Sequence, residues 1–167
     1  MLRAVGHLVN EYITFCRPNA YVFNGWVYGI WPPGRKRLTS AMAAMSGLCA
    51  AHIRAYRLIH DVRRELGFSD SRVFFALEYR VFIPRNRFNP LHRAAALEME
   101  RLFQSNPAVA MLTGEFRAPL KCPGKDRRGT FADFHAVDYD TRSAVAGLTE
   151  QAPAQVFEKP AGTRSPA

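Results

Sequence analysis

Residues 12–34 read YITFCRPNAYVFNGWVYGIWPPG, and this stretch decides the fold. The segment that leads into it, residues 9–15 (VNEYITF), is apolar and β-branched, which predicts a short buried strand. Pro18 and Asn19 break that strand, and residues 32–34 (PPG) mark a loop. The stretch therefore predicts one strand, an aromatic-rich connection and a loop that leads to the next element.

A long helix is predicted over residues 38–66. Its apolar residues recur every three or four positions, as on one face of a helix: Met42, Met45, Leu48, Ala51, Ala55, Leu58, Ile59 and Val62. Thr39 or Ser40 can cap the start of this helix, and Gly67 suits its end.

The rest of the chain continues to alternate between strand and helix. Residues 73–77 (VFFAL) are continuously apolar, like a parallel strand covered on both faces, and residues 131–137 are a third strand candidate. Between them, residues 91–104 predict a helix whose inward side chains are Leu91, Ala95, Leu97, Met99, Leu102 and Phe103. This order predicts an α/β fold with parallel pairing, in one domain over residues 1–150. Residues 151–167 are rich in Ala, Pro, Gly, Ser and Thr and are expected to be a disordered tail.

Composition narrows the class of protein. The 167 residues are 48% hydrophobic, enough for one core, and no run reaches the roughly 20 apolar residues of a membrane span. The net charge of +9 is mostly Arg, spread without a run of five basic residues, so compositional bias is favoured over a nucleic-acid surface. Cys16, Cys49 and Cys122 are scattered, which supports neither a disulfide framework nor a zinc site. With no apolar leader at the N-terminus, a cytoplasmic protein without metal or cofactor is expected.

The opening stretch closely resembles the fourth barrel strand of the family 1 β-glycosidases, the β-glucosidase family. That motif reads W-I-T-x-N-E-P-N, followed by an aromatic run and P-P-G. The later segments LCAAHIRAYRLIH, VFFALEYRVFIPRNRFNPLHRAAALEMERLF, AMLTGEFRAP and FADFHAVDYDTRSAV are similar to the family's next motifs, in the same order. The resemblance covers about residues 6–146. It implies a partial (β/α)8 TIM barrel that holds strands four to six with their helices.

The sequence departs from the family where the chemistry is expected. In the family, the Glu of N-E-P is the general acid/base and the preceding Asn binds the sugar 2-hydroxyl. Here Arg17 and Cys16 stand at those positions. A guanidinium stays protonated and cannot cycle a proton, so no inherited catalytic residue is assigned. The family's T-E-N-G motif, which carries the nucleophile, does not occur, and retaining hydrolysis needs two carboxyl groups about 5 Å apart.

Four residues remain as candidates for contacting a sugar. Cys16 takes the Asn position, and Glu78 follows the second strand where the family often has an Asn that faces the aglycone. Tyr139 and Asp140 stand in the family's N-Y-Y motif, whose second Tyr normally contacts the nucleophile. We assign Cys16, Glu78, Tyr139 and Asp140 as substrate-binding candidates, with a β-glucoside or another sugar as the ligand that the resemblance implies.

Several alternatives remain open for these residues. Glu78 and Asp140 could form a replacement carboxylate pair, although drift is favoured, and Arg17 could pair with Glu78 across the barrel mouth. Cys16 could act as a nucleophile beside a cation, but no His accompanies it in the motif. His52 and His60 lie on one helix face, where packing is favoured over metal binding. For the aromatic side chains Tyr21, Phe23, Trp26, Tyr28 and Trp31, core packing is favoured over a sugar platform.

Three strands of eight cannot close a barrel, so unpaired edges and an apolar sheet face are expected. The chain is therefore expected to self-associate or to be completed by another polypeptide.

Whether it is an enzyme is left open. The primary hypothesis is a β-glucosidase-like chain in carbohydrate metabolism by descent, inactive alone. The alternatives are a non-catalytic carbohydrate-binding protein and a half-barrel that assembles with another chain.

Overall fold

The computed structural model describes residue 3 and residues 6–124, 128–147 and 155–156, with the side chains of residues 140, 141, 155 and 156 excepted. Three parallel strands form a sheet in sequence order: β1 (Glu11–Cys16), β2 (Arg72–Pro84) and β3 (Phe134–Val145). A two-residue strand, β4 (Gln155–Val156), pairs antiparallel with the end of β3. The prediction of an α/β fold with parallel pairing is confirmed.

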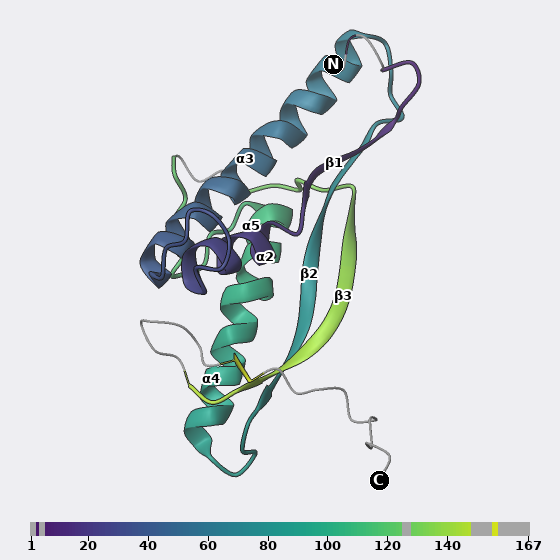
Figure 1. The fold of residues 1–167 in the computed structure, drawn as a ribbon. Helices are drawn as coiled ribbons and strands as arrows, with labels where there is room; N and C mark the ends of the chain where they lie inside the picture. The colour runs from purple at the N-terminus through teal and green to yellow at the C-terminus, as the bar shows by residue number, and fades with distance from the viewer. Residues whose placement is uncertain (1–2, 4–5, 125–127, 148–154, 157–167) are drawn as a thin grey trace.

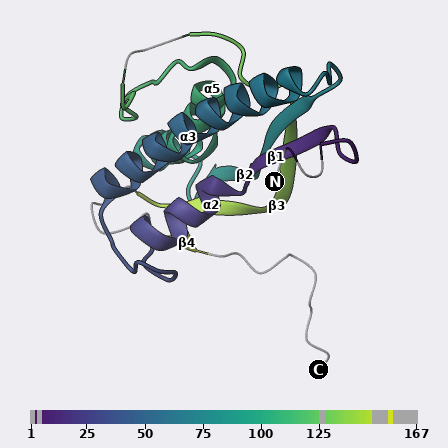
Figure 2. The same cartoon turned by 90° about the horizontal axis from the view of Figure 1, so that it is seen from above.

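The helices of the two crossovers lie on one face of this sheet (Figure 1). After β1 come α2 (Pro18–Val22), a π-helical turn η1 (Phe23–Val27) and the long α3 (Leu38–Glu65). After β2 come α4 (Pro90–Glu100), a second π-helical turn η2 (Arg101–Ser105) and α5 (Asn106–Thr113). The view from above keeps α3 and α5 on the same side of the strands (Figure 2). Crossovers that return on one face wind the sheet in one direction, as in a (β/α) barrel.

The long helix α3 matches its predicted span within one residue at the C-terminus. Gly67 takes φ 82° just beyond the end, which is the left-handed conformation expected of a glycine there. The predicted cap at Thr39 or Ser40 is wrong, because the helix begins at Leu38 and Arg37 precedes it without a side-chain cap.

The second crossover differs from the prediction in its detail. The predicted helix over 91–104 is the first part of a longer helical segment that a π-helical turn divides before α5. Leu91 and Leu97 are not inward, since they are 74% and 64% exposed. Both strands that flank this crossover extend past their predicted ends, because their parallel ladder continues to the pair Pro84 and Val145.

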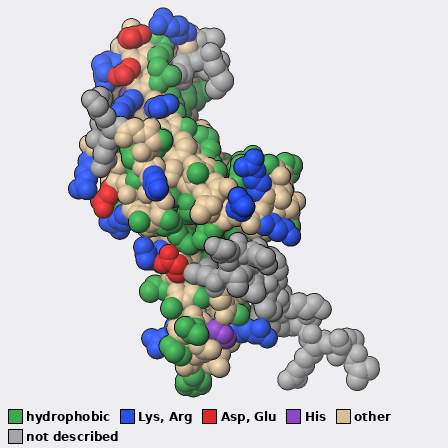
Figure 3. Space-filling view, turned by 90° about the vertical axis from the view of Figure 1, so that its left-hand side faces the viewer, with side chains coloured by type: hydrophobic (Ala, Val, Ile, Leu, Met, Phe, Trp, Pro, Cys, Tyr) green, Lys and Arg blue, Asp and Glu red, His purple; other side chains and the backbone are tan. Residues whose placement is uncertain are grey.

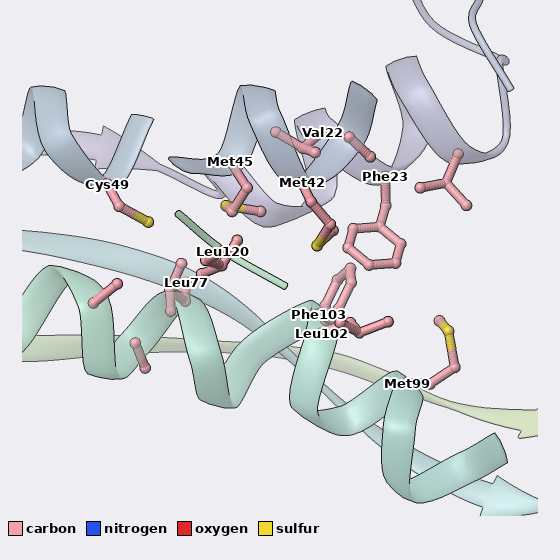
Figure 4. Close-up of a cluster of buried hydrophobic side chains, with 14 of the residues drawn as sticks. Val22, Phe23, Met42, Met45, Cys49, Leu77, Met99, Leu102, Phe103 and Leu120 are labelled. Atoms are coloured by element: carbon pink, nitrogen blue, oxygen red, sulfur yellow. The ribbon is translucent and has the colours of Figure 1, made fainter. Parts of the chain in front are cut away.

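The core lies between the sheet and the helices (Figure 4). Phe103 of η2 is its aromatic centre, with its ring edge-on to Phe23 at 5.0 Å and to Phe82 at 5.6 Å between centroids. Met42 and Met45 of α3 cover the same cluster from the other side. Of the aromatic connection after β1, Phe23 is buried and Trp26 and Tyr28 pack against the core, as favoured. Core packing is wrong for Tyr21 and Trp31, which are 45% and 46% exposed.

Two parts of the sheet lack a described helix above them. On the face away from the helices, Ile13 is 55% exposed and the rings of Phe74 and Phe134 stack at 3.8 Å. On the helix-facing side of β3, Val137 and Tyr139 are more than half exposed. No described helix has the length and apolar character that a membrane crossing requires.

Candidate active site at the carboxyl ends of the strands

The residues of the first motif meet at the carboxyl ends of the strands. Cys16 is the last residue of β1 and is exposed, and Arg17 follows with φ 53°, in the left-handed region. The Arg17 amide donates to the carbonyl of Ala76 at 2.8 Å, which ties this turn to β2. In (β/α) barrels the carboxyl end of the sheet is the face that carries active sites, so this end is the candidate site.

Two carboxylates lie side by side here. Glu78 of β2 and Asp138 of β3 are register partners in the parallel ladder. Arg17 donates from Nε to Asp138, and Arg80 donates from Nε to Glu78. The pairing of Arg17 with Glu78, which the sequence left open as an alternative, is not the one formed. The third strand places Asp138 within reach of Arg17, and Arg80 pairs with Glu78 on the same strand.

The Glu78 pair is almost fully enclosed. The side chains of Glu78 and Arg80 are 3% and 12% exposed, against 32% for Asp138 and 40% for Arg17. The guanidinium of Arg80 also lies over the Phe103 ring, 5.2 Å from its centroid. The Arg80 amide donates to Gln104 at 3.0 Å. Arg80 and Glu78 are thus fixed in the core, whereas Arg17 and Asp138 face solvent.

Asn19 holds the end of β1 against β2. Its side chain donates to the carbonyl of Glu78 at 2.6 Å and accepts from the Glu78 amide at 3.1 Å, and the residue is fully buried. The ladder between β1 and β2 becomes irregular between Ile13 and Cys16, so the backbone of β1 does not reach Glu78. The amide of Asn19 takes the place of a strand partner there, which fixes Glu78 in the site.

The four substrate-binding candidates do not all come together. Cys16 ends β1 and pairs with Ala76, and Glu78 follows two residues later on β2, which itself continues to Pro84. Tyr139 is register partner of Tyr79, whose side chain packs against the core, and successive strand residues face opposite sides. Tyr139 is therefore on the helix side, 57% exposed, away from Glu78. The side chain of Asp140 lies outside the described part of the chain.

A tyrosine–histidine pair stands behind the carboxylates on the helix side. The Tyr79 hydroxyl and Nε2 of His135 are 3.0 Å apart. Burial, followed by the nearby charge of Glu100, raises the pKa of Tyr79, and burial lowers the pKa of His135. Both shifts favour the uncharged forms, so this pair adds a neutral hydrogen bond between β2 and β3 rather than a charge.

The two helix histidines have structural partners. His52 is buried, with Nδ1 2.7 Å from the Thr14 hydroxyl and Nε2 2.7 Å from the Phe131 carbonyl. His60 and Tyr56 both reach the carboxylate of Asp133, at 3.0 and 3.1 Å. These contacts tie α3 to the start of β3, at the opposite end of the sheet from the candidate site.

The site is an alternating set of charges: Arg17, Asp138, Glu78 and Arg80. Asp138 and Glu78 each contact a guanidinium, which occupies lone pairs that a substrate proton would otherwise use. Sequence reasoning missed two residues of this set, Asp138 and Arg80, which are charged residues just beyond the predicted strands 73–77 and 131–137. Their contacts were not visible in the sequence, because these depend on the register between β2 and β3. Chemically, such a set can bind hydroxyl groups through charged donors and acceptors.

The sequence matches the model of glycosyl hydrolase family 1 over residues 1–148. No match was found among curated protein sequences. Solved structures similar to this chain are β-glycosidases that are much longer than it is.

A double mutant of the β-glucosidase from Trichoderma harzianum is 22% identical with a TM-score of 0.73, over 98% of this chain and 39% of that one. The Thermotoga maritima β-glucosidase in complex with deoxynojirimycin is 17% identical with a TM-score of 0.71, over 95% and 37%. The β-glycosidase from Pyrococcus horikoshii is 26% identical with a TM-score of 0.62, over 80% and 29%. The chain thus spans less than two fifths of the length of these proteins, and its fold is the predicted portion of a (β/α)8 barrel.

Proposed function

This chain belongs to glycosyl hydrolase family 1, and on that premise we propose that it is a β-glucosidase-like barrel portion that does not hydrolyse glycosides by itself. The observation that carries the proposal is Arg17. It stands where the family's motif has the acid/base Glu, and its guanidinium contacts Asp138. An arginine stays protonated at any working pH and cannot donate and recover a proton in each cycle.

The described carboxylates support the same proposal. Glu78 is enclosed and paired with Arg80, so it has neither the access nor the freedom that an attacking carboxylate needs. Asp138 is paired with Arg17. Retention requires a nucleophile and an acid about 5 Å apart on either side of the scissile bond. In this proposal neither role is filled by the residues at the strand ends.

A hydrolysis assay tests the proposal. The purified chain is incubated with an aryl β-glucoside, with buffer as the blank and an active β-glucosidase as the assay control. We expect release of the aryl group at the buffer rate. Release well above buffer that is lost in Glu78→Gln or Asp138→Asn would show that the replacement carboxylates work, and the proposal would be rejected.

A second candidate function is sugar binding without turnover. The observation in its favour is the exposed pair of Arg17 and Asp138, which presents donors and acceptors at the mouth of the sheet. Because the similar Thermotoga maritima structure contains deoxynojirimycin, this compound is a suitable probe. Saturable binding to the chain that weakens in Arg17→Met, but not in Arg72→Met at the other end of β2, would support this function.

A further alternative is a half-barrel that assembles with another chain, which supplies more strands. The uncovered sheet face and the outer edge of β1 favour it. Co-expression with the remaining strands of a family 1 barrel, followed by co-purification, tests this assembly. We propose a cytoplasmic location in either case, a setting that keeps the thiols of Cys16, Cys49 and Cys122 reduced.

A further inference from the structure

A cavity that is separate from the strand ends lies on the outer side of α3. Its volume is about 320 Å³, and it lies between α3 and residues 114–124, the connection that leads from α5 towards β3, with an opening to solvent. Arg54 and Arg57 line it from the helix, and Phe116 and Pro123 line it from the connection. The site described above shares none of these residues.

The charge of this cavity is positive and uncompensated among its described lining residues. Arg54 and Arg57 are one helical turn apart, and neither forms an ion pair with a described carboxylate; Arg64, further along the helix, is paired with Asp61. Two like charges at this spacing repel each other on a helix. The face of the molecule in Figure 3 shows the same imbalance, with blue side chains at many places and red ones at few. An anion between the two guanidinium groups would remove this repulsion.

Arg57 is also held in place. Its guanidinium lies over the ring of Phe131, 4.7 Å from the centroid, so part of its side chain is already ordered before any ligand arrives. A guanidinium presents a planar fork of donors that suits phosphate and carboxylate oxygens. Because the Arg57 side chain is ordered before the ligand arrives, binding loses less side-chain entropy.

The remaining wall of the cavity is apolar. Ile53, Phe116 and Pro123 line it, together with small residues of α3 and of the connection. A free inorganic anion would leave this wall in contact with water. A volume of about 320 Å³ is at the small end of ligand cavities and suits a single ring with one charged group.

We propose that this cavity binds a small organic anion, with Arg54 and Arg57 on its phosphate or carboxylate group and Ile53, Phe116 and Pro123 against its apolar part. The proposal is independent of glycoside chemistry, because it uses a different face of the molecule. It does not require the strands that would complete the barrel.

Equilibrium dialysis of the full chain tests this proposal with phenyl phosphate and inorganic phosphate as probes. The method tolerates self-association, and KCl keeps the ionic strength constant, so general screening of the basic surface is equal in all arms. We expect saturable binding of phenyl phosphate, about tenfold tighter than inorganic phosphate because only the former covers the apolar wall. A benzoate arm shows whether a carboxylate is accepted in place of the phosphate.

Variants identify the binding residues. Arg54→Gln with Arg57→Gln should weaken phenyl phosphate at least about tenfold, since charged hydrogen bonds are lost. Arg64→Gln, on the same helix but outside this cavity, removes one charge and should leave binding unchanged. Arg54→Gln alone is the second variant, because Arg57 also contacts Phe131 and its loss could disturb the fold. Absent binding, equal affinity for both phosphates, or full affinity in the double variant and in Arg54→Gln would overturn the proposal.

Discussion

At residue 17 the backbone turns through the left-handed region with a side chain that points to β3, two strands away from its own. The neighbouring Cys16 is exposed, so both residues of the altered motif can be replaced without opening the core. In a barrel of this family, the two positions would carry Asn and Glu. They are therefore the residues at which loss of chemistry can be tested most directly.

The double reversion Cys16→Asn with Arg17→Glu should restore no hydrolysis in the isolated chain. It returns a general acid, which contributes about 10² to 10⁴-fold, but covalent retention also needs a nucleophile about 5 Å away. An aryl β-glucoside assay and intact-mass analysis check this expectation. A trapped glycosyl adduct on the reverted chain would contradict it, and would mean that one of the carboxylates already present attacks the sugar.

Asn19 contributes to stability through two hydrogen bonds to one residue. Asn19→Ala should lower the free energy of unfolding by about 2–4 kcal/mol, because the buried amide and carbonyl of Glu78 both lose their side-chain partner. Urea unfolding measures the change. Asn86→Ala removes an exposed asparagine from a local turn and should cost less than about 1 kcal/mol. Equal effects of the two changes would show that Asn19 does not replace a strand partner.

Stability should fall in mild acid because of His52, which is buried, and His135, which is half-buried. Burial lowers the pKa of His52 from its usual 6.5, and burial also lowers the pKa of His135. As the pH falls, the unfolded chain therefore takes up protons at a higher pH than the folded chain. The free energy of unfolding keeps its full value above pH 6.5 and declines as the pH falls below it. Urea midpoints at pH 7.5 and 5.5 measure this loss, and His52→Asn should reduce it. A midpoint that rises on acidification would have the wrong sign.

Sequence could identify Arg17 as the altered residue, because motif order alone fixes its position. Sequence could not identify its partner. Asp138 lies 121 positions further on, and its contact with Arg17 depends on the register of three strands. Glu78 was the nearer candidate in sequence, but a strand places residues two apart on one face, so Arg80 lies beside it.

The consecutive helical elements α4 and η2 contain one buried and one exposed apolar residue, and the stability cost of removing each can be compared. Phe103→Ala should lower the free energy of unfolding by about 3–5 kcal/mol, since its ring contacts Phe23 and Phe82 in the core. Leu97→Ala, in the same helical segment but 64% exposed, should change it by less than about 0.5 kcal/mol. Thermal or urea unfolding of both variants makes the comparison. A large loss in Leu97→Ala would point to a covering partner that these contacts do not include.

Helix α3 was predictable because its apolar residues recur at helical spacing from Met42 to Val62 and Gly67 follows its end. The lengths of β2 and β3 were not, because residues such as Arg80 and Arg142 interrupt the apolar run while the backbone ladder continues. Leu91 and Leu97 were assigned to the core on residue type alone. Their exposure follows from the geometry of the helix, whose buried line runs through Ala95, Ala96 and Met99.

At the scale of the whole molecule, the uncovered parts of the sheet determine whether the chain self-associates in solution. The isolated chain should self-associate, because Ile13, Val137 and Tyr139 are more than half exposed and the outer edge of β1 has no strand partner in the described sheet. Size-exclusion chromatography with light scattering should show species larger than 18.8 kDa, and a hydrophobic dye should bind. A monodisperse monomer with a cooperative thermal transition and no dye binding would argue against this expectation.

The class of the whole fold was predictable from the sequence, and so was the expectation that three strands leave the barrel open. Strand and helix alternate clearly enough to give parallel pairing, and shared motifs give the barrel. Which surfaces remain uncovered depends on where each crossover passes, and that became visible only with α3, α4 and α5 placed on one face.

The parallel pairing of the strands also affects when the sheet can form during synthesis of the chain. The hydroxyl of Thr14 contacts the carbonyl of Phe74, and the carboxylate of Asp133 contacts the amide of Val73; each pair is 60 positions apart. A ribosome adds about 5–20 residues per second, so each strand waits about 3–12 s before its neighbour has been made. During that interval β1 has no strand partner, and its apolar side chains are open to association with other chains until the ladder can close.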